Sequence, residues 1–174
     1  MKRLLSIIFW LTFHVFFSQN GFTTYTTSAL ITGLKMQTAF LVDNNGNKWI
    51  GYQTISNGNA GLLKYDNTNW TLYNQSSNPT FPSNRVTALA KDNNGNIWIG
   101  CDSGLVKFDG SVFTTYSTAQ GLPMKYINCV EVVGNQIYVG TNKGLSRFDG
   151  ISFSNYNVAN GQLPYDSIKS IKAE

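Results

Sequence analysis

The stretch DNNGNIWIG at residues 92–100 decides the fold, because it returns almost unchanged as DNNGNKWIG at residues 43–51. Asn and Gly tolerate left-handed backbone and Asp bonds its own turn, so DNNGN is typical of a tight turn between strands. A calcium loop would need more carboxylates and a distal Glu. The third copy, VVGNQIYVG at 132–140, lacks the Asp and has Tyr138 in place of Trp. We therefore interpret DNNGN as a structural turn and expect no metal and no cofactor.

Two other strings share this period. The string G-L-x-K/R-F/Y-D and an aromatic-x-x-Tyr string both recur, and from Gly100 to Gly140 every landmark is repeated after 40 residues. A period near 40 with several short strands per unit predicts a β-propeller. The strands expected in the second unit are 86–91, 96–100, 105–108 and 112–116. We expect the repeated Trp49 and Trp98 to pack between neighbouring blades.

The predicted fold class is all-β, a partial β-propeller of about three four-stranded antiparallel blades plus loose N- and C-terminal strands. Three blades are fewer than the smallest usual propeller of four. We therefore expect the chain to be part of a longer protein. The alternative is a truncated product that self-associates through its open blade edges. The expected bounds are about 38–73 for blade 1, 86–116 for blade 2, 127–156 for blade 3, 167–172 for the start of blade 4, and 22–25 for a closing strand.

The N-terminus is typical of a signal peptide over residues 1–18. Two basic residues precede an apolar stretch at 4–17, and cleavage would leave 19–174 as the incomplete propeller. The alternative is an uncleaved anchor, because Phe16 at the −3 position is not small. Cleavage would remove two of the 13 basic residues, leaving 11 against 9 acidic ones, and also His14. We expect an exported protein, periplasmic or extracellular at the cell surface, with no nucleic-acid partner.

The long connections group on one face of the expected propeller, where binding residues usually gather. The connection 52–60 holds nine residues where the other two blades have three. Aromatic and amide side chains suit a small-molecule or oligosaccharide ligand. The residues expected to contact that ligand are Tyr52, Asn57, Asn59, Arg85, Lys125 and Tyr126.

The strings D-N-N-G-N-I-W-I-G, G-L-V-K-F-D-G, F-T-T-Y and G-L-P resemble the two-component regulator propeller repeat, over residues 22–172. In that family the repeats form the exported, ligand-sensing part of bacterial hybrid sensor kinases, often linked to polysaccharide use. The resemblance implies a sensor module for signal transduction, with membrane and kinase only in parts that follow Glu174. The first alternative is a secreted binding or adhesion propeller without a kinase.

The second alternative is an enzyme, because streptogramin lyases are propellers with similar D-x-x-G-x-I-W strings. General acid–base catalysis most often uses His, and the processed chain would have none. Only Asp102, Glu131 and Asp166 lie away from turns, and no sequence feature pairs them. We therefore expect no catalytic residues. Cys101 and Cys129 are expected to stay free, because adjacent blades diverge beyond disulfide distance.

Overall fold

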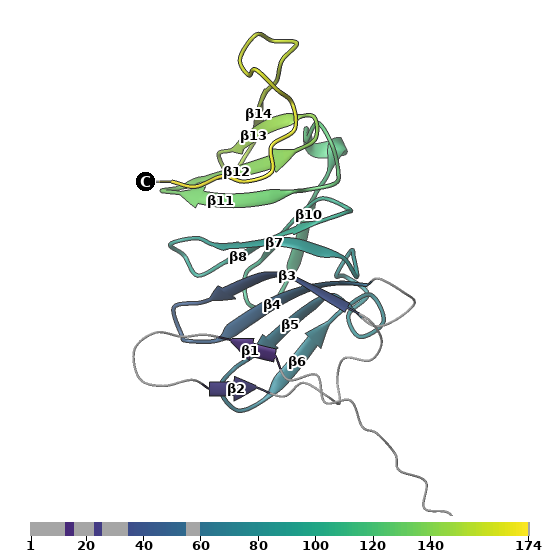
Figure 1. Cartoon of the computed structure of the whole chain (residues 1–174), viewed down its shortest axis with the longest axis vertical. Coiled ribbons are helices and arrows are strands. Elements are labelled where there is room, and N and C mark those ends of the chain that lie inside the picture. Colours follow the sequence, from purple (N-terminus) through teal and green to yellow (C-terminus); the bar gives the residue numbers. More distant parts are fainter. Residues whose placement is uncertain (1–12, 16–22, 26–34, 55–59, 174) are drawn as a thin grey trace, which may run out of the picture. The chain divides into compact units, whose positions relative to one another are not determined.

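The computed structural model describes residues 13–15, 23–25, 35–54 and 60–173. The chain divides into two compact units, Met1–Thr32 and Gly33–Glu174. In the first unit, β1 (Phe13–Val15) pairs antiparallel with β2 (Thr23–Tyr25) (Figure 1). β1 falls within the predicted signal peptide and β2 within the predicted closing strand, and both roles stay predictions.

The second unit contains three four-stranded antiparallel sheets, and in each sheet the strand order follows the chain order (Figure 1). This confirms the predicted fold class. A single turn of 3-10 helix, η1 (Thr118–Gln120), lies between the second and third sheets. Across the described ranges, no helix is both long and apolar enough to cross a membrane. The strands are β3 (Lys35–Val42), β4 (Lys48–Thr54), β5 (Leu62–Tyr65) and β6 (Trp70–Tyr73); β7 (Val86–Lys91), β8 (Ile97–Cys101), β9 (Leu105–Phe108) and β10 (Phe113–Tyr116); β11 (Cys129–Val133), β12 (Gln136–Thr141), β13 (Gly144–Phe148) and β14 (Phe153–Tyr156).

One carboxylate holds each DNNGN turn. In the β7–β8 turn, Oδ1 of Asp92 accepts hydrogen bonds from the backbone N–H of Asn94 (3.0 Å) and of Asn96 (2.9 Å). Its Oδ2 accepts from the Asn96 amide (2.7 Å) and from the indole N–H of Trp98 (2.9 Å). Asp43 accepts the same set of bonds in the β3–β4 turn. The interpretation of DNNGN as a structural turn is confirmed, because both carboxylate oxygens are used inside it.

These bonds also link stability to pH. Burial is the largest single influence on the pKa of Asp92 and raises it, but the hydrogen bonds from Asn96, Trp98 and the turn backbone outweigh it. The net pKa therefore lies below the ordinary value of 3.8, and the same holds for Asp43. A lowered folded-state pKa means that the folded state favours the ionised form. Its contribution to stability is complete above the unfolded pKa and is lost as pH falls through the folded pKa.

We expect the double variant Asp43→Asn/Asp92→Asn to be less stable than the wild type at neutral pH. The deficit should shrink as the pH falls below about 4, because the wild type then loses the same carboxylate bonds. The other turn carboxylates with lowered pKa values are present in both proteins, so their contributions cancel. Urea denaturation of both proteins between about pH 3 and pH 7 measures the difference. A deficit that stays constant over this range would contradict the prediction.

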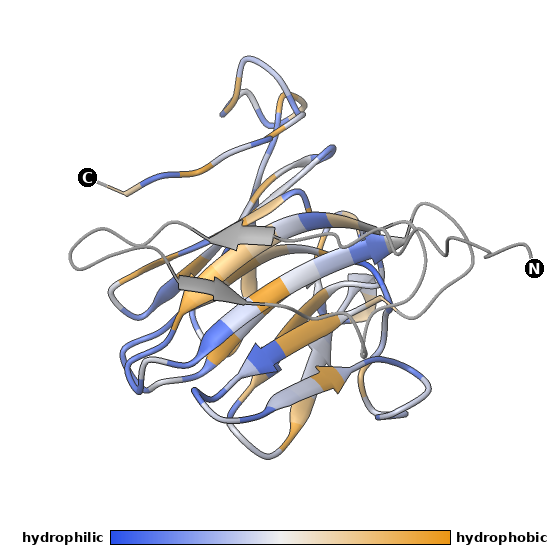
Figure 2. Cartoon of the chain, turned by 60° about the horizontal axis from the view of Figure 1, so that its bottom comes forward, coloured by the Kyte–Doolittle hydropathy of each residue, from blue (hydrophilic) through white to orange (hydrophobic). Residues whose placement is uncertain are grey.

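The hydrophobic core lies between consecutive sheets. One buried cluster joins Trp49 and Leu62 of the first sheet to Ile99 and Phe108 of the second. A second cluster joins residues of the second sheet, such as Trp98, to residues of the third. Hydrophobic and hydrophilic segments accordingly alternate along the strands in Figure 2. Each sheet therefore buries its apolar residues only with the help of its neighbour.

The two repeated Trp residues make contacts across these interfaces. The ring of Trp49 lies 5.8 Å from that of Phe108 on the next sheet, and Trp98 lies 6.0 Å from Phe148, both edge to face. Lys107 extends over the Trp98 ring from the neighbouring strand of the same sheet. The predicted packing of these Trp residues between blades is confirmed.

The glycines that end the repeated W-I-G and Y-V-G strings allow the sheets to approach closely. A Cβ atom at Gly100 would lie 2.8 Å from a methyl group of Ile127, just before β11. Gly140 is covered in the same way by Ile168, at 2.7 Å. Separations under 3.0 Å are not tolerated, so a larger residue would push the sheets apart. The chain from 167 to 172 contains no assigned strand, and its predicted role as the start of a fourth blade stays a prediction.

Candidate ligand-binding site

The first strands of the three sheets, β3, β7 and β11, are called the inner strands. One polar side chain at an equivalent position, in or just before each inner strand, ties it to the next repeat. Thr38 and Thr87 each lie at a β-bulge near the start of β3 and β7. Their hydroxyls donate to a main-chain carbonyl of the next repeat, Thr38 to the first residue of β7 (2.6 Å) and Thr87 to Ile127 (2.7 Å). Asn128 donates its amide to the carbonyl of Ile168 (2.9 Å) in the same manner. This ladder brings polar groups of successive repeats side by side.

An open cavity of about 330 Å³ lies along this ladder. Small-molecule sites usually have volumes of about 300–1,000 Å³, so the cavity has room for a ligand of one or two sugar rings. Its polar lining is made of amides and hydroxyls, with one aromatic ring and one ammonium group. Besides Thr38, Thr87 and Asn128, the lining includes Gln37, Gln53, Tyr126 and Lys169.

Arg85 lies beside this cavity and connects two of the residues that line it. Its Nε–H donates to Oε1 of Gln53 (3.0 Å), which belongs to β4 in the first sheet. Its guanidinium carbon lies 5.3 Å from the ring centre of Tyr126, just before β11. An Arg over a Tyr face is held by attraction to the ring electrons. Residues from three repeats therefore meet at one point of the site.

A second cavity, of about 320 Å³, has Arg85 in its wall. Asp102 and Ser83 are in its wall, and the Ser83 hydroxyl donates to the Asp102 carboxylate (2.5 Å). The same hydroxyl accepts the backbone N–H of Arg85 (2.8 Å). Asp102 therefore has a partner that its sequence context did not indicate, and this partner fixes the chain just before β7.

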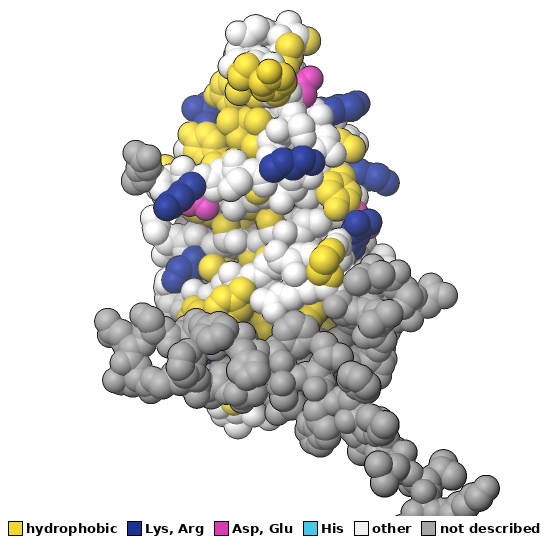
Figure 3. Space-filling model, viewed as in Figure 1, with side chains coloured by type: hydrophobic (Ala, Val, Ile, Leu, Met, Phe, Trp, Pro, Cys, Tyr) yellow, Lys and Arg dark blue, Asp and Glu magenta, His cyan; other side chains and the backbone are white. Residues whose placement is uncertain are grey.

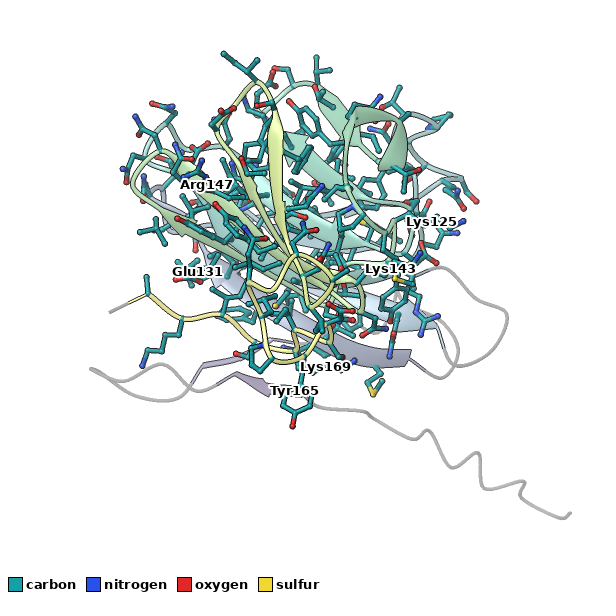
Figure 4. All side chains as sticks on the ribbon, turned by 90° about the horizontal axis from the view of Figure 1, so that it is seen from above. Lys125, Glu131, Lys143, Arg147, Tyr165 and Lys169 are labelled. Carbon is teal, nitrogen blue, oxygen red and sulfur yellow. The ribbon has the colours of Figure 1, made fainter. Side chains whose placement is uncertain are left out.

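The structure places the predicted ligand contacts as follows. Arg85 and Tyr126 are brought together, and both border a cavity. Lys125 is exposed. In Figure 4 it lies on the side of the unit opposite Glu131. Asn57 and Asn59 lie outside the described residues.

The structure does not support the predicted ligand contact of Tyr52. Only 2% of this residue is exposed, and burial raises the pKa of its phenol to about 12. The cause is its place in the repeat. Tyr52 pairs with Gln37 as Cys101 pairs with Val86, so it belongs to the core of the blade and not to the insertion. β3 and β4 then continue by two further pairs, as far as Lys35.

Most residues of the cavity lining were not predicted from the sequence. Thr38, Thr87 and Asn128 carried a usable signal, because a polar residue recurs at the same position of each repeat, directly before Ala39, Ala88 or Cys129. Gln53 carried no such signal, because it lies in the long connection 52–60, where the other repeats have only three residues. Lys169 lines the cavity through the segment after β14, which has no regular structure.

The described residues contain no group of three or more His, Cys, Asp or Glu side chains that could hold a metal ion. Cys101 and Cys129 are free thiols, the first buried at the end of β8 and the second half-buried at the start of β11. Burial raises the pKa of the Cys101 thiol above its ordinary value, which disfavours the reactive thiolate. The chemistry of this site is therefore that of hydrogen bonding, ring stacking and positive charge.

Comparisons with known proteins place the fold. Among solved structures, the extracellular domain of the hybrid two component system BT3049 from B. thetaiotaomicron matches with a TM-score of 0.66 and 23% identity, over 86% of this chain and 20% of that chain. The extracellular domain of BT4673 from the same organism matches with a TM-score of 0.40 and 21% identity, over 70% of this chain and 21% of that chain. This chain thus spans about a fifth of these structures. No curated protein sequence matches it.

The first of these likenesses shows the propeller fold. In addition, the family model described as two component regulator propeller matches residues 80–103, which include β7, the DNNGN turn and β8. This is the stretch whose repetition indicated the fold, and the resemblance stated from the repeats is confirmed. The chain therefore carries the two component regulator propeller repeat within a partial β-propeller.

Proposed function

We propose that this chain is part of the exported, ligand-binding portion of a two-component sensor, on the periplasmic or extracellular side of the membrane, and that its ligand is a carbohydrate. The observation that carries the proposal is the cavity beside the inner strands. It combines one aromatic ring, Tyr126, with amide and hydroxyl groups from three repeats. Sugars offer hydroxyl groups for hydrogen bonds and an apolar ring face for stacking, so this set of side chains is complementary to them.

Two further observations support the proposal. Residues 80–103 match the two component regulator propeller, and a structure of the same fold is the extracellular domain of a hybrid two component system. The site also lies where several connecting segments meet on a rigid set of sheets, which is the usual location of binding sites. The alternatives of a secreted adhesion propeller and of a propeller lyase have no comparable observation in their favour.

The test is calorimetric titration of the full-length gene product with a panel of neutral and acidic oligosaccharides. Binding of at least one of them, with competition by its own monosaccharides, would support the proposal. A panel in which no glycan binds, at concentrations up to about 1 mM, would count against a carbohydrate ligand.

The long connection 52–60, which has six residues more than its counterparts and is called the insertion, provides a sharper prediction for the same assay. Deleting residues 54–59 leaves Tyr52, Gln53 and Ala60 before Gly61, which is the length of Cys101–Ser103 before Gly104 in the second repeat. The deletion keeps the buried Tyr52 and Ala60 and the contact between Gln53 and Arg85.

We expect the shortened protein to fold but to bind its glycan at least tenfold more weakly, a loss of about 1.4 kcal/mol. The second repeat forms its sheet without the extra residues, so the fold does not require them. The hairpin of β3 and β4, however, ends beside the cavity, so the residues that follow it are placed to contact a ligand there. Replacing residues 55–59 by a Gly/Ser stretch of equal length is the matched control for loop length. Equal affinity of the shortened and intact proteins would remove the insertion from the site.

A further inference from the structure

We propose that the site selects an acidic saccharide, and that Arg85 binds the carboxylate of a uronic acid residue in it. This inference rests on the proposed function, because it names the class of carbohydrate that the same site accepts. Three observations carry it: how Arg85 is held, what its guanidinium leaves unpaired, and how charge is distributed around the two cavities.

Arg85 is oriented before any ligand arrives. Gln53 accepts the Nε–H, and Tyr126 supports the guanidinium, at 3.0 Å and 5.3 Å respectively. The two supports come from the first and third repeats, while Arg85 itself precedes β7 of the second. A side chain held from two sides loses less conformational freedom on binding than a free one, so more of the interaction energy appears as affinity.

The support leaves one edge of the guanidinium available. A guanidinium has five N–H donors, and Gln53 takes only the one on Nε. Among the described residues, the side chain of Arg85 has no partner besides Gln53 and Tyr126. The two terminal nitrogens form the fork that binds a planar carboxylate through two parallel hydrogen bonds. Arg85 is exposed, so this fork is accessible to a ligand.

On the side of the first cavity, no carboxylate of the described residues offsets this charge. The first cavity is lined by Lys169 and by no carboxylate. The second contains the Asp102 carboxylate, which accepts the Ser83 hydroxyl and makes no ion pair with Arg85, so an anionic ligand is favoured in the first cavity. Figure 3 shows Lys and Arg side chains along both edges of the described surface, with few Asp or Glu between them. In Figure 4, Lys125 and Lys143 lie on one side together, away from Glu131.

The position of Arg85 adds a constraint on the ligand. It lies in the wall of the second cavity, and its two supports line the first. A sugar in the first cavity would place its ring against amides and hydroxyls and its carboxylate near Gln53 and Tyr126, the two residues that hold the Arg85 guanidinium. The arrangement therefore favours uronic acid sugars over neutral sugars of the same size and linkage.

The experiment compares matched glycans on the full-length gene product. Oligomers of galacturonate, glucuronate and mannuronate are each titrated beside their carboxyl-reduced counterparts, which keep the size and linkage but lose the charge. We expect one uronate oligomer to bind at least tenfold more tightly than its reduced counterpart, and its affinity to fall with added salt. Arg85→Gln and Arg85→Lys should each lower that affinity at least tenfold, because Lys keeps the charge but not the fork.

Lys91→Gln is the matched control for net charge. Lys91 is also exposed, lies at the far end of β7, about 20 Å from Arg85 by strand length, and donates to Asn44. The Lys91→Gln variant should bind the uronate oligomer with an affinity within twofold of the wild type. The thermal midpoint of each variant shows whether it is folded. If Arg85→Gln does not fold, Arg85→Lys still decides the test.

The outcomes separate this inference from the proposed function. Equal binding of a uronate oligomer and its reduced counterpart by the wild type would overturn the acidic class and leave a carbohydrate sensor in place. Preference for uronate that survives both Arg85 substitutions would overturn the role of Arg85. An absence of binding by every uronate oligomer would overturn the acidic class, and the proposed carbohydrate ligand is overturned as well only where the neutral glycans of the panel also fail to bind.

Discussion

A Gly104→Ala variant is expected to lose about 3–5 kcal/mol of unfolding free energy, enough to unfold a marginally stable domain. Gly104 begins the G-L-V-K-F-D string and has a φ angle of +140°, which residues with a side chain rarely adopt. A Cβ atom there would also lie 2.3 Å from the main-chain oxygen of Tyr116, at the end of β10. A backbone oxygen inside a sheet cannot move aside as a flexible side chain could. The cost therefore combines backbone strain with a steric clash.

Gly110→Ala separates these two contributions. Gly110 also has a positive φ angle, +102°, but an added Cβ would have no atom within 4 Å. We expect this control to cost only about 1–2 kcal/mol, the strain alone. Chemical denaturation of the two variants and the wild type, followed by near-ultraviolet circular dichroism, gives the comparison. Equal losses for Gly104→Ala and Gly110→Ala would show that the clash with Tyr116 is relieved and that only the φ angle matters.

Much of the fold could be predicted because each repeat combines local turn chemistry with a regular spacing. The expected strands 86–91 and 105–108 coincide with β7 and β9, whereas β8 is shifted by one residue at both ends and β10 begins one residue later than expected. The DNNGN turn was predictable because Asp and Asn bond the backbone a few residues away. Such local bonds do not depend on the rest of the chain, so a short string specifies them.

The site was less predictable because it depends on contacts between repeats. Arg85, Gln53 and Tyr126 are far apart in the sequence and meet only because consecutive repeats pack against one another. Tyr52 illustrates the opposite error. Its neighbours in the insertion are Gly, Asn and Ser, which favour a loop, but its repeat position is the one that Cys101 occupies in the second sheet. Comparing the residue after each W-I-G glycine would have placed it in the core.

We expect Trp98→Ala to cost about 3–5 kcal/mol, as other truncations of large core side chains do. Trp98 is 3% exposed. Its ring stacks on Tyr116 of its own sheet (6.0 Å) and meets Phe148 of the next sheet edge to face (6.0 Å). Its indole N–H also donates to Asp92 at 2.9 Å. Removing the ring therefore opens a cavity between two sheets and leaves one turn carboxylate short of a donor.

The size of the loss should depend on the neighbouring sheet. Trp98→Phe keeps most of the ring contacts and removes the hydrogen bond to Asp92, so we expect it to cost about 1–2 kcal/mol. In a double-mutant cycle, Trp98→Ala and Phe148→Leu should be non-additive, because each removes one side of the same contact. Thermal and urea denaturation of the full-length gene product measure these values. An unchanged melting temperature for Trp98→Ala would show that the ring does not hold the sheets together, and a role for this aromatic position in ligand binding would then be the better explanation of its recurrence.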